Sequence, residues 1–168
     1  MCFKDQVIFE ESEIVKQDNT PYTVFTPYKN KWLANFKTLM PHKFVKQDLR
    51  QFASIGIVFP SREALGIQTA QIQVMPYDLS QLDCYASDRD FPSRSITSLL
   101  GAHLRFGTVS IRKIISGLGP DKSVFLSELI WREFFMQILF HFPKVVSHNF
   151  RAKYDLIEWR NDAKEFKL

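Results

Sequence analysis

The segment with the clearest potential for chemistry is Ser123–Phe142, SVFLSELIWREFFMQILFHF, in which charged side chains interrupt a strongly apolar run. It contains no Gly or Pro before Pro143, which predicts a single helix. The apolar residues are spread around nearly the whole helix, so we expect the helix to be buried. A charged side chain in such a helix needs a partner, either within the protein or on a bound molecule.

Three residues of this helix, Glu128, Trp131 and Phe135, are spaced i, i+3 and i+7 and therefore lie on one face. One interpretation is structural: Glu128 pairs with Arg132 at i+4, which stabilises a helix by about 0.3–0.5 kcal/mol, and Trp131 belongs to the core. The other is that Glu128 and Trp131 face a bound molecule. On spacing alone, the structural interpretation is the simpler one.

A second segment, Thr97–Gly101, stands at the start of a predicted helix, directly before HLRFG. The free N–H groups of a helix start and two hydroxyl groups together form a ready site for an anion. A Thr-Ser pair is also an ordinary helix cap, and the residues alone leave both interpretations open.

Three strings, taken in order, resemble one family. SELIWREFF is similar to ELIWREF(F/Y), the signature helix of the photolyase/cryptochrome flavoproteins, and TSLLGAHLRFG is similar to their flavin-phosphate loop, TSxLSxxLRFG. YASDRDFP, at Tyr85–Pro92, resembles their YxxxRDxP and stands at the family's spacing before Thr97. DQVIFE and PYTVFTPYKNKW also resemble family sequence. The resemblance covers almost the whole chain, whereas the chain resembles only the middle of the family's sequence.

The resemblance implies FAD as the cofactor. The flavin contacts that it implies are Tyr85, Thr97, Ser98, Leu99, Leu100, Gly101, Phe125 and Arg132. Gly101 replaces the family's usual serine, so one hydroxyl contact is lost while the backbone N–H remains, and we expect weaker anion binding. Phe125 stands where many relatives carry Trp. Arg132 would support the flavin phosphates or the pocket wall through charge-assisted hydrogen bonds.

The resemblance also implies a DNA site. Glu128 would hydrogen-bond or protonate a damaged pyrimidine, and Trp131 would stack flat on the flipped-out dimer. Arg89 would contact a DNA phosphate, and Phe135 would share the DNA-facing side of the helix. Trp159, in LIEWRND, resembles the outermost tryptophan of the family's electron relay. A half-exposed loop tryptophan is the favoured interpretation of Trp159, because the inner relay members are missing from this sequence.

Composition is consistent with a helical protein inside the cell. The 168 residues include 16 Phe, 5 Tyr and 3 Trp but only 6 Gly, which favours packed helices. The net charge of +4 permits a polyanionic partner without requiring one. Two cysteines without a CxxC or a His cluster indicate neither a disulfide framework nor a metal site. The start lacks the apolar core of a signal peptide and no apolar run has membrane length, so we expect a soluble, cytoplasmic protein.

The expected fold class is mainly α: the helical portion of a photolyase-type FAD-binding domain, preceded by a short β-containing interdomain segment and a long linker. Residues 1–40 would end an antenna-binding α/β domain, with β runs at 5–10 and 22–25. Residues 41–79 would be the interdomain linker, with short helical turns at 44–52 and 61–65. Residues 80–168 would be the N-terminal part of an incomplete FAD- and DNA-binding helical domain. Helices are expected at 28–39, 79–87, 98–105, 110–116 and 123–142.

The function implied is light-driven repair of cyclobutane pyrimidine dimers in DNA, a carbon–carbon lyase reaction driven by an electron from reduced FAD. A chain from the middle of that sequence is expected to be inactive alone. An antenna chromophore, folate or deazaflavin, is expected only in the full-length protein, which we expect to be a monomer. Two alternatives remain: a cryptochrome-type blue-light photoreceptor, and a non-catalytic basic DNA-binding remnant.

Overall fold

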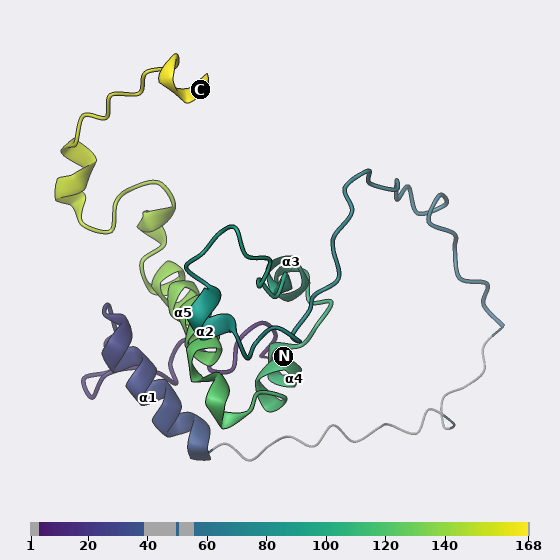
Figure 1. The fold of residues 1–168 in the computed structure, drawn as a ribbon, viewed down its shortest axis with the longest axis horizontal. Helices are drawn as coiled ribbons and strands as arrows, with labels where there is room; N and C mark the ends of the chain where they lie inside the picture. Colours follow the sequence, from purple (N-terminus) through teal and green to yellow (C-terminus); the bar gives the residue numbers. More distant parts are fainter. Residues whose placement is uncertain (1–3, 39–49, 51–55, 168) are drawn as a thin grey trace. The chain divides into compact units, whose positions relative to one another are not determined.

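The computed structural model describes residues 4–38, residue 50 and residues 56–167. The chain divides into two units, residues 1–38 with 111–168 and residues 39–110, and each is described by itself (Figure 1). Within the described residues the fold is mainly α, as predicted, and the β-type pairing there is an isolated antiparallel bridge between Val15 and Pro21.

The elements of the first unit are α1 (Phe25–Thr38), α4 (Ile111–Ser116), α5 (Ser123–His141) and the short 3-10 helices η2 (Pro120–Lys122), η3 (Pro143–Val146), η4 (Ala152–Leu156) and η5 (Glu165–Lys167). The second unit contains α2 (Tyr85–Asp88) and α3 (Leu100–Arg105).

Helix α5 ends where the sequence predicts, because Pro143 cannot continue it and the Phe142 N–H closes the last turn on the Ile138 carbonyl. Its buried residues form one stripe: Phe125, Leu129, Ile130, Glu133, Phe134 and Gln137. On the remaining surface Phe135 is 60% exposed, and Leu139 and Phe140 are also exposed. The prediction of burial around the whole helix is therefore wrong for the described chain, since its neighbours in the first unit cover one face of α5.

Helix α1 begins three residues earlier than expected, at Phe25, and the predicted β run at residues 22–25 is not a strand. Pro27 fits in the first turn, where its missing N–H is not needed. Tyr28 and Trp32 stand one turn apart, are each 1% exposed and pack toward α5. Helix α1 is therefore held by one aromatic stripe, which Phe25 and Phe36 extend at its two ends.

The other predicted elements are partly correct. The helix predicted at residues 79–87 is a series of turns that leads into the short α2, and residues 61–65 form a turn closed by the Leu65 N–H on the Ser61 carbonyl, 3.1 Å. Residues 56–79 form no helix or strand. The rest of the predicted linker, with most of the turn at 44–52, lies outside the described residues, and the three-part domain division stays a prediction.

The first unit is organised around Glu133, a buried carboxylate on α5 that is 3% exposed. Its Oε2 accepts the Ile8 N–H at 2.6 Å, and its Oε1 accepts the Phe9 N–H at 3.2 Å and the Trp32 indole N–H at 2.8 Å. The Tyr28 hydroxyl lies 3.5 Å from the same Oε1. One carboxylate therefore joins the N-terminal segment and α1 to α5. The sequence left open whether a charged side chain in this helix has its partner within the protein or on a bound molecule. For Glu133 the partners are within the protein.

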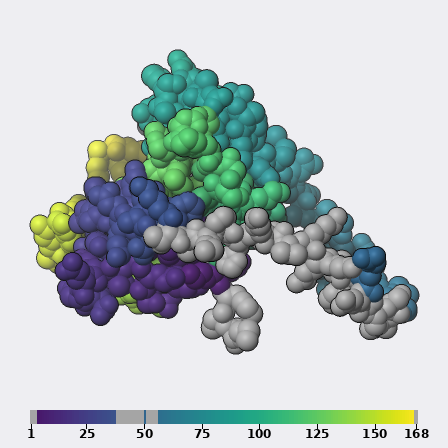
Figure 2. Space-filling model, turned by 90° about the horizontal axis from the view of Figure 1, so that it is seen from below, coloured from purple at the N-terminus to yellow at the C-terminus, as the bar shows by residue number. Residues whose placement is uncertain are grey.

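Further side chains hold the backbone of the N-terminal segment, residues 4–11. Arg132 donates to the Gln6 carbonyl at 2.7 Å, and His141 Nε2 lies 3.1 Å from the Glu11 carbonyl. Arg112 of α4 donates to the carbonyls of Lys4, Asp5 and Val7. Hydrogen bonding to these side chains takes the place of the strand predicted at residues 5–10. Figure 2 shows the N-terminal segment, in purple, lying directly against α1.

We predict that Glu133→Gln lowers the free energy of unfolding by about 3 kcal/mol, because an amide has one acceptor oxygen and its NH2 group faces backbone donors. Urea unfolding followed by far-ultraviolet circular dichroism measures this change. Glu158→Gln, the same substitution at an exposed position of the same unit, is the control and should change stability by less than about 0.5 kcal/mol. Equal stability of the two variants would contradict the role of Glu133.

Candidate functional site

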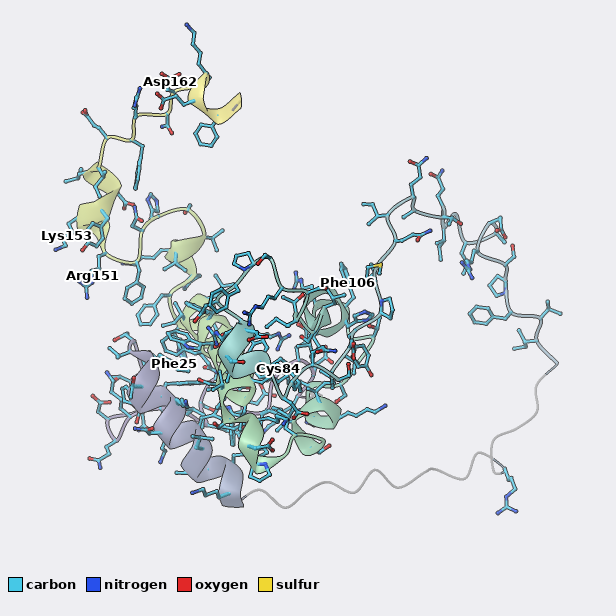
Figure 3. The ribbon with its side chains drawn as sticks, in the orientation of Figure 1. Phe25, Cys84, Phe106, Arg151, Lys153 and Asp162 are labelled. Atoms are coloured by element: carbon cyan, nitrogen blue, oxygen red, sulfur yellow. The ribbon has the colours of Figure 1, made fainter. Side chains whose placement is uncertain are left out.

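Trp131 lies in an aromatic cluster formed by α1 and α5. The Phe25 ring stacks on the Trp131 indole with centroids 3.6 Å apart and planes 9° apart. Phe135, one turn along α5, lies at 5.3 Å and 23°, and the edge of the buried Phe134 meets the indole at 5.6 Å and 75°. Figure 3 shows Phe25 where α1 begins, next to α5. The indole is therefore half-buried and closely packed.

Glu128 lies one turn before Trp131 on the same face of α5 and is half-buried. Its neighbour Ser127 accepts a hydrogen bond from the Lys29 ammonium of α1 at 3.1 Å, a further link between the two helices. The structure thus places Glu128, Trp131 and Phe135 together, as the spacing predicted. A carboxyl group beside a flat aromatic surface can hydrogen-bond the edge of a planar ring that lies on that surface.

Arg132 and Phe125, predicted to contact a flavin, lie on the packed side of α5. Besides the Gln6 carbonyl, Arg132 reaches the Gln6 side-chain oxygen at 3.3 Å, so its guanidinium supports the wall of the first unit. The two roles expected for Arg132, at the flavin phosphates or at the pocket wall, stay predictions. Phe125 is buried and contributes to the core.

Burial and hydrogen bonding shift the pKa values of two groups in the interface between α1 and α5, Glu133 and Tyr28. Burial raises the pKa of Glu133, and the N–H donors of Ile8, Trp32 and Phe9 together with the Tyr28 hydroxyl oppose that shift. The pKa of Tyr28 is raised, first by burial and then by the charge and the hydrogen bond of Glu133. The phenol therefore remains a neutral donor to the carboxylate.

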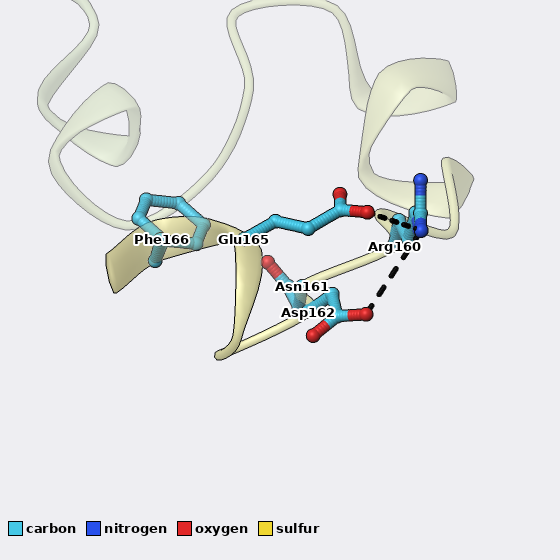
Figure 4. A pocket seen from close by; sticks show the side chains of 5 residues that line it. All are labelled: Arg160, Asn161, Asp162, Glu165 and Phe166. Carbon is cyan, nitrogen blue, oxygen red and sulfur yellow. Dashed lines mark hydrogen bonds and ion pairs between the residues drawn. The ribbon is translucent and has the colours of Figure 1, made fainter. Parts of the chain in front are cut away.

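Trp159 lies apart from this cluster and is 71% exposed, on the segment between η4 and η5. It is followed by a shallow hollow lined by Arg160, Asn161, Asp162, Glu165 and Phe166 (Figure 4). Arg160 pairs there with both Glu165 and Asp162. One guanidinium and two carboxylates are thus already engaged with one another in this hollow.

In the second unit, Tyr85 opens α2 and Arg89 follows its last residue. The Arg89 guanidinium lies over the Tyr85 ring, 5.7 Å from its centroid, and 3.6 Å from the Asp90 carboxylate. A cation over an aromatic face is favourable and holds both side chains in place. The cationic end of Arg89 is at the surface.

The segment Thr97–Gly101 leads into α3, which begins at Leu100 rather than at the predicted Ser98. The capping residue is Leu99, with a left-handed backbone at φ 54° and ψ 19°, and it makes no side-chain capping hydrogen bond. The side chain of the capping residue therefore does not serve as an acceptor for the first N–H groups of α3. A Cβ atom added at Gly101 would meet nothing within 4 Å, so the space beside it is open.

His103 connects α3 to an earlier segment of the same unit, an arrangement that sequence reasoning missed. Its Nε2 lies 2.9 Å from the Met75 carbonyl, and its Nδ1 lies 2.8 Å from the Thr108 hydroxyl. A carbonyl oxygen only accepts, so Nε2 carries a proton and donates to Met75. The Asp78 N–H also donates to the Ser98 carbonyl at 3.0 Å, which fixes the loop before α3.

The predicted site residues therefore fall into two groups. Phe125, Glu128, Trp131, Arg132 and Phe135 share α5 in the first unit, which also holds Trp159, while Tyr85, Arg89 and residues 97–101 lie in the second unit. Sequence reasoning also missed Phe25. The helical spacing of Phe25, Tyr28, Trp32 and Phe36 was the signal that could have found it.

Two features do not occur among the described residues. Among them, no helix combines the length and the apolar character needed to cross a bilayer. Across the same residues, no three His, Cys, Asp or Glu side chains gather as they would around a metal ion.

Comparison with known proteins relates the sequence to one family. Residues 125–168 match the family model described as the FAD binding domain of DNA photolyase. Over 98% of its length the chain is 29% identical to the deoxyribodipyrimidine photo-lyase of Agrobacterium fabrum, and over 95% it is 30% identical to that of Alkalihalophilus pseudofirmus and 29% identical to that of Escherichia coli. It covers 40%, 38% and 39% of these relatives, respectively. The chain thus spans about 40% of the length of the relatives it matches.

Proposed function

We propose that the protein belongs to the DNA photolyase family, which the comparisons support, and that it uses light to repair cyclobutane pyrimidine dimers in DNA, with FAD as its cofactor. The activity is proposed for the whole protein, since this chain spans about 40% of the length of its relatives. The observation that carries the proposal is that Glu128 and Trp131 lie on one face of α5, within the residues that match the FAD-binding domain.

Trp131 and Glu128 have complementary roles toward a flipped-out dimer. The indole supplies a flat surface on which a pyrimidine stacks, a contact that tolerates many bases. The carboxyl group, one turn away, supplies the directional contact: it donates to a pyrimidine carbonyl when protonated and accepts from a ring N–H when ionised. FAD, when bound in its reduced form, would supply the electron-transfer chemistry that opens the cyclobutane ring. Glu128 and Trp131 hold the dimer in place during that reaction.

The loop before α3 fits the phosphates of such a cofactor. The hydroxyls of Thr97 and Ser98 and the N–H groups of Leu100 and Gly101 would hold them, because Leu99 leaves the helix start without a side-chain cap. The open space beside Gly101 leaves room for an approaching anion. Tyr85, in the same unit, would pack against the flavin.

DNA is the proposed partner. The net charge of +4 favours a polyanion, and we assign Arg89 to a backbone phosphate and the exposed Phe135 to the DNA-facing side of α5. Trp159 is assigned to electron transfer at the surface, where its exposure suits an outermost relay position. We propose a cytoplasmic monomer for the whole protein.

We predict that Trp131→Ala removes discrimination of a dimer while affinity for undamaged DNA remains, because stacking on a base contributes about 1–3 kcal/mol. The measurement is the ratio of dissociation constants for a single-stranded oligonucleotide with and without one cyclobutane thymine dimer. Trp159→Ala, which removes an exposed tryptophan of the same unit, is the control and should leave the ratio unchanged. Equal losses for both oligonucleotides in Trp131→Ala would contradict the stacking role and favour a DNA-binding remnant.

We also predict that Gly101→Ser tightens FAD binding, because it restores a hydroxyl at the phosphate loop and the added Cβ has free space. Serine is also the better helix former, by about 0.5 kcal/mol. Titration of flavin fluorescence with the chain measures the affinity. Ala102→Ser, which places the hydroxyl about 100° further around α3, is the control. Unchanged affinity in Gly101→Ser would count against phosphate binding at this loop.

A further inference from the structure

The aromatic rings of Phe25 and Trp131 are stacked on one another. The two rings are nearly parallel, at 9°, and their centroids are 3.6 Å apart, so the phenyl ring lies in van der Waals contact with one face of the indole. Phe25 comes from α1, more than a hundred residues before Trp131 in the sequence. The stack is thus a tertiary contact on the residue assigned to base stacking.

The position of Phe25 is fixed by the docking of α1. One turn further along α1, Tyr28 approaches Glu133 with its hydroxyl, and Trp32 donates its indole N–H to the same carboxylate at 2.8 Å. The edge of Phe134 meets the Phe25 ring at 5.8 Å and 68° and the Trp131 ring at 5.6 Å and 75°. Phe134 is buried, so the two stacked rings share a rigid neighbour.

The Trp131 ring has a second stacked neighbour, Phe135, which differs from Phe25 in its exposure. Phe25 belongs to the packed interface of α1 and α5, whereas Phe135, the other stacked neighbour of the indole, is 60% exposed. An exposed phenylalanine on the helix surface can change rotamer at little cost, while Phe25 cannot move without α1. Phe25 therefore supports the indole from α1, and a base that stacks on the indole would displace the exposed Phe135 ring.

We propose that Phe25 is a positioning residue for base recognition: by stacking on the inner face of Trp131 it fixes the plane of the indole, so that the outer face receives a pyrimidine. This inference rests on the proposed function of Trp131. A large side chain that is already ordered avoids the entropy loss of being immobilised on binding. Phe25 thereby increases affinity for the stacked base without touching it.

The test uses the 168-residue chain and the two oligonucleotides, with and without a thymine dimer. Phe25→Leu removes the flat ring, and we expect the ratio of the two dissociation constants to fall about three- to tenfold, the range that corresponds to ordering one large side chain. Phe25→Tyr keeps the ring and should restore the ratio. Phe36→Leu removes a comparable stack, on Trp32 at 4.8 Å and 18° at the other end of α1, and is the matched control.

A double-mutant cycle separates positioning from general stability. In the Trp131→Ala background Phe25→Leu should have no further effect on the ratio, because its effect passes through the indole. The inference would be overturned if the effects of the two substitutions were additive, or if Phe25→Leu had the same ratio of dissociation constants as the unmodified chain. Neither result would contradict the proposed role of Trp131. A ratio unaffected by Trp131→Ala would overturn the proposed function and this inference with it. If Phe25→Leu fails to fold, Phe25→Met, whose flexible side chain fills irregular gaps without a flat ring, gives the same comparison.

Discussion

The first unit depends on one buried carboxylate with several hydrogen-bond donors around it. A charged group in an apolar helix is costly to bury, and Glu133 is tolerated because the N–H groups of Ile8 and Phe9 and the indole of Trp32 point at it. The same bonds satisfy backbone donors of a segment that forms no strand. The arrangement also fixes the direction of α1, because two residues of this helix, Tyr28 and Trp32, both approach the Glu133 carboxylate.

The consequence for the site is geometric. Once Trp32 and Tyr28 hold α1 against α5, Phe25 is carried onto the indole of Trp131. The two sides of α5 therefore have different tasks: Glu133 and Arg132 face inward and hold the structure, while Glu128, Trp131 and Phe135 present an aromatic and acidic face. In this account a structural carboxylate and a functional one lie five residues apart on the same helix and act through different neighbours.

The sequence predicted the helical class and the bounds of α5 well, because helix formers without Gly or Pro between Ser123 and Pro143 leave few alternatives. It also placed Glu128, Trp131 and Phe135 on one face, since helical spacing decides this locally. It failed at residues 5–10 and 22–25, where β-prone residues suggested strands. Their conformation is decided by distant partners such as Glu133, which local propensity cannot reveal. The stack of Phe25 on Trp131 was missed for the same reason.

The most direct test of this account is hydrogen exchange measured by NMR on the 168-residue chain. The amides of Ile8 and Phe9 and the indole N–H of Trp32 should be protected as strongly as the middle of α5, because all three donate to Glu133. In Glu133→Gln their protection should fall while the middle of α5 remains protected. Rapid exchange of these three protons in the unmodified chain, with α5 still protected, would contradict the central role of Glu133.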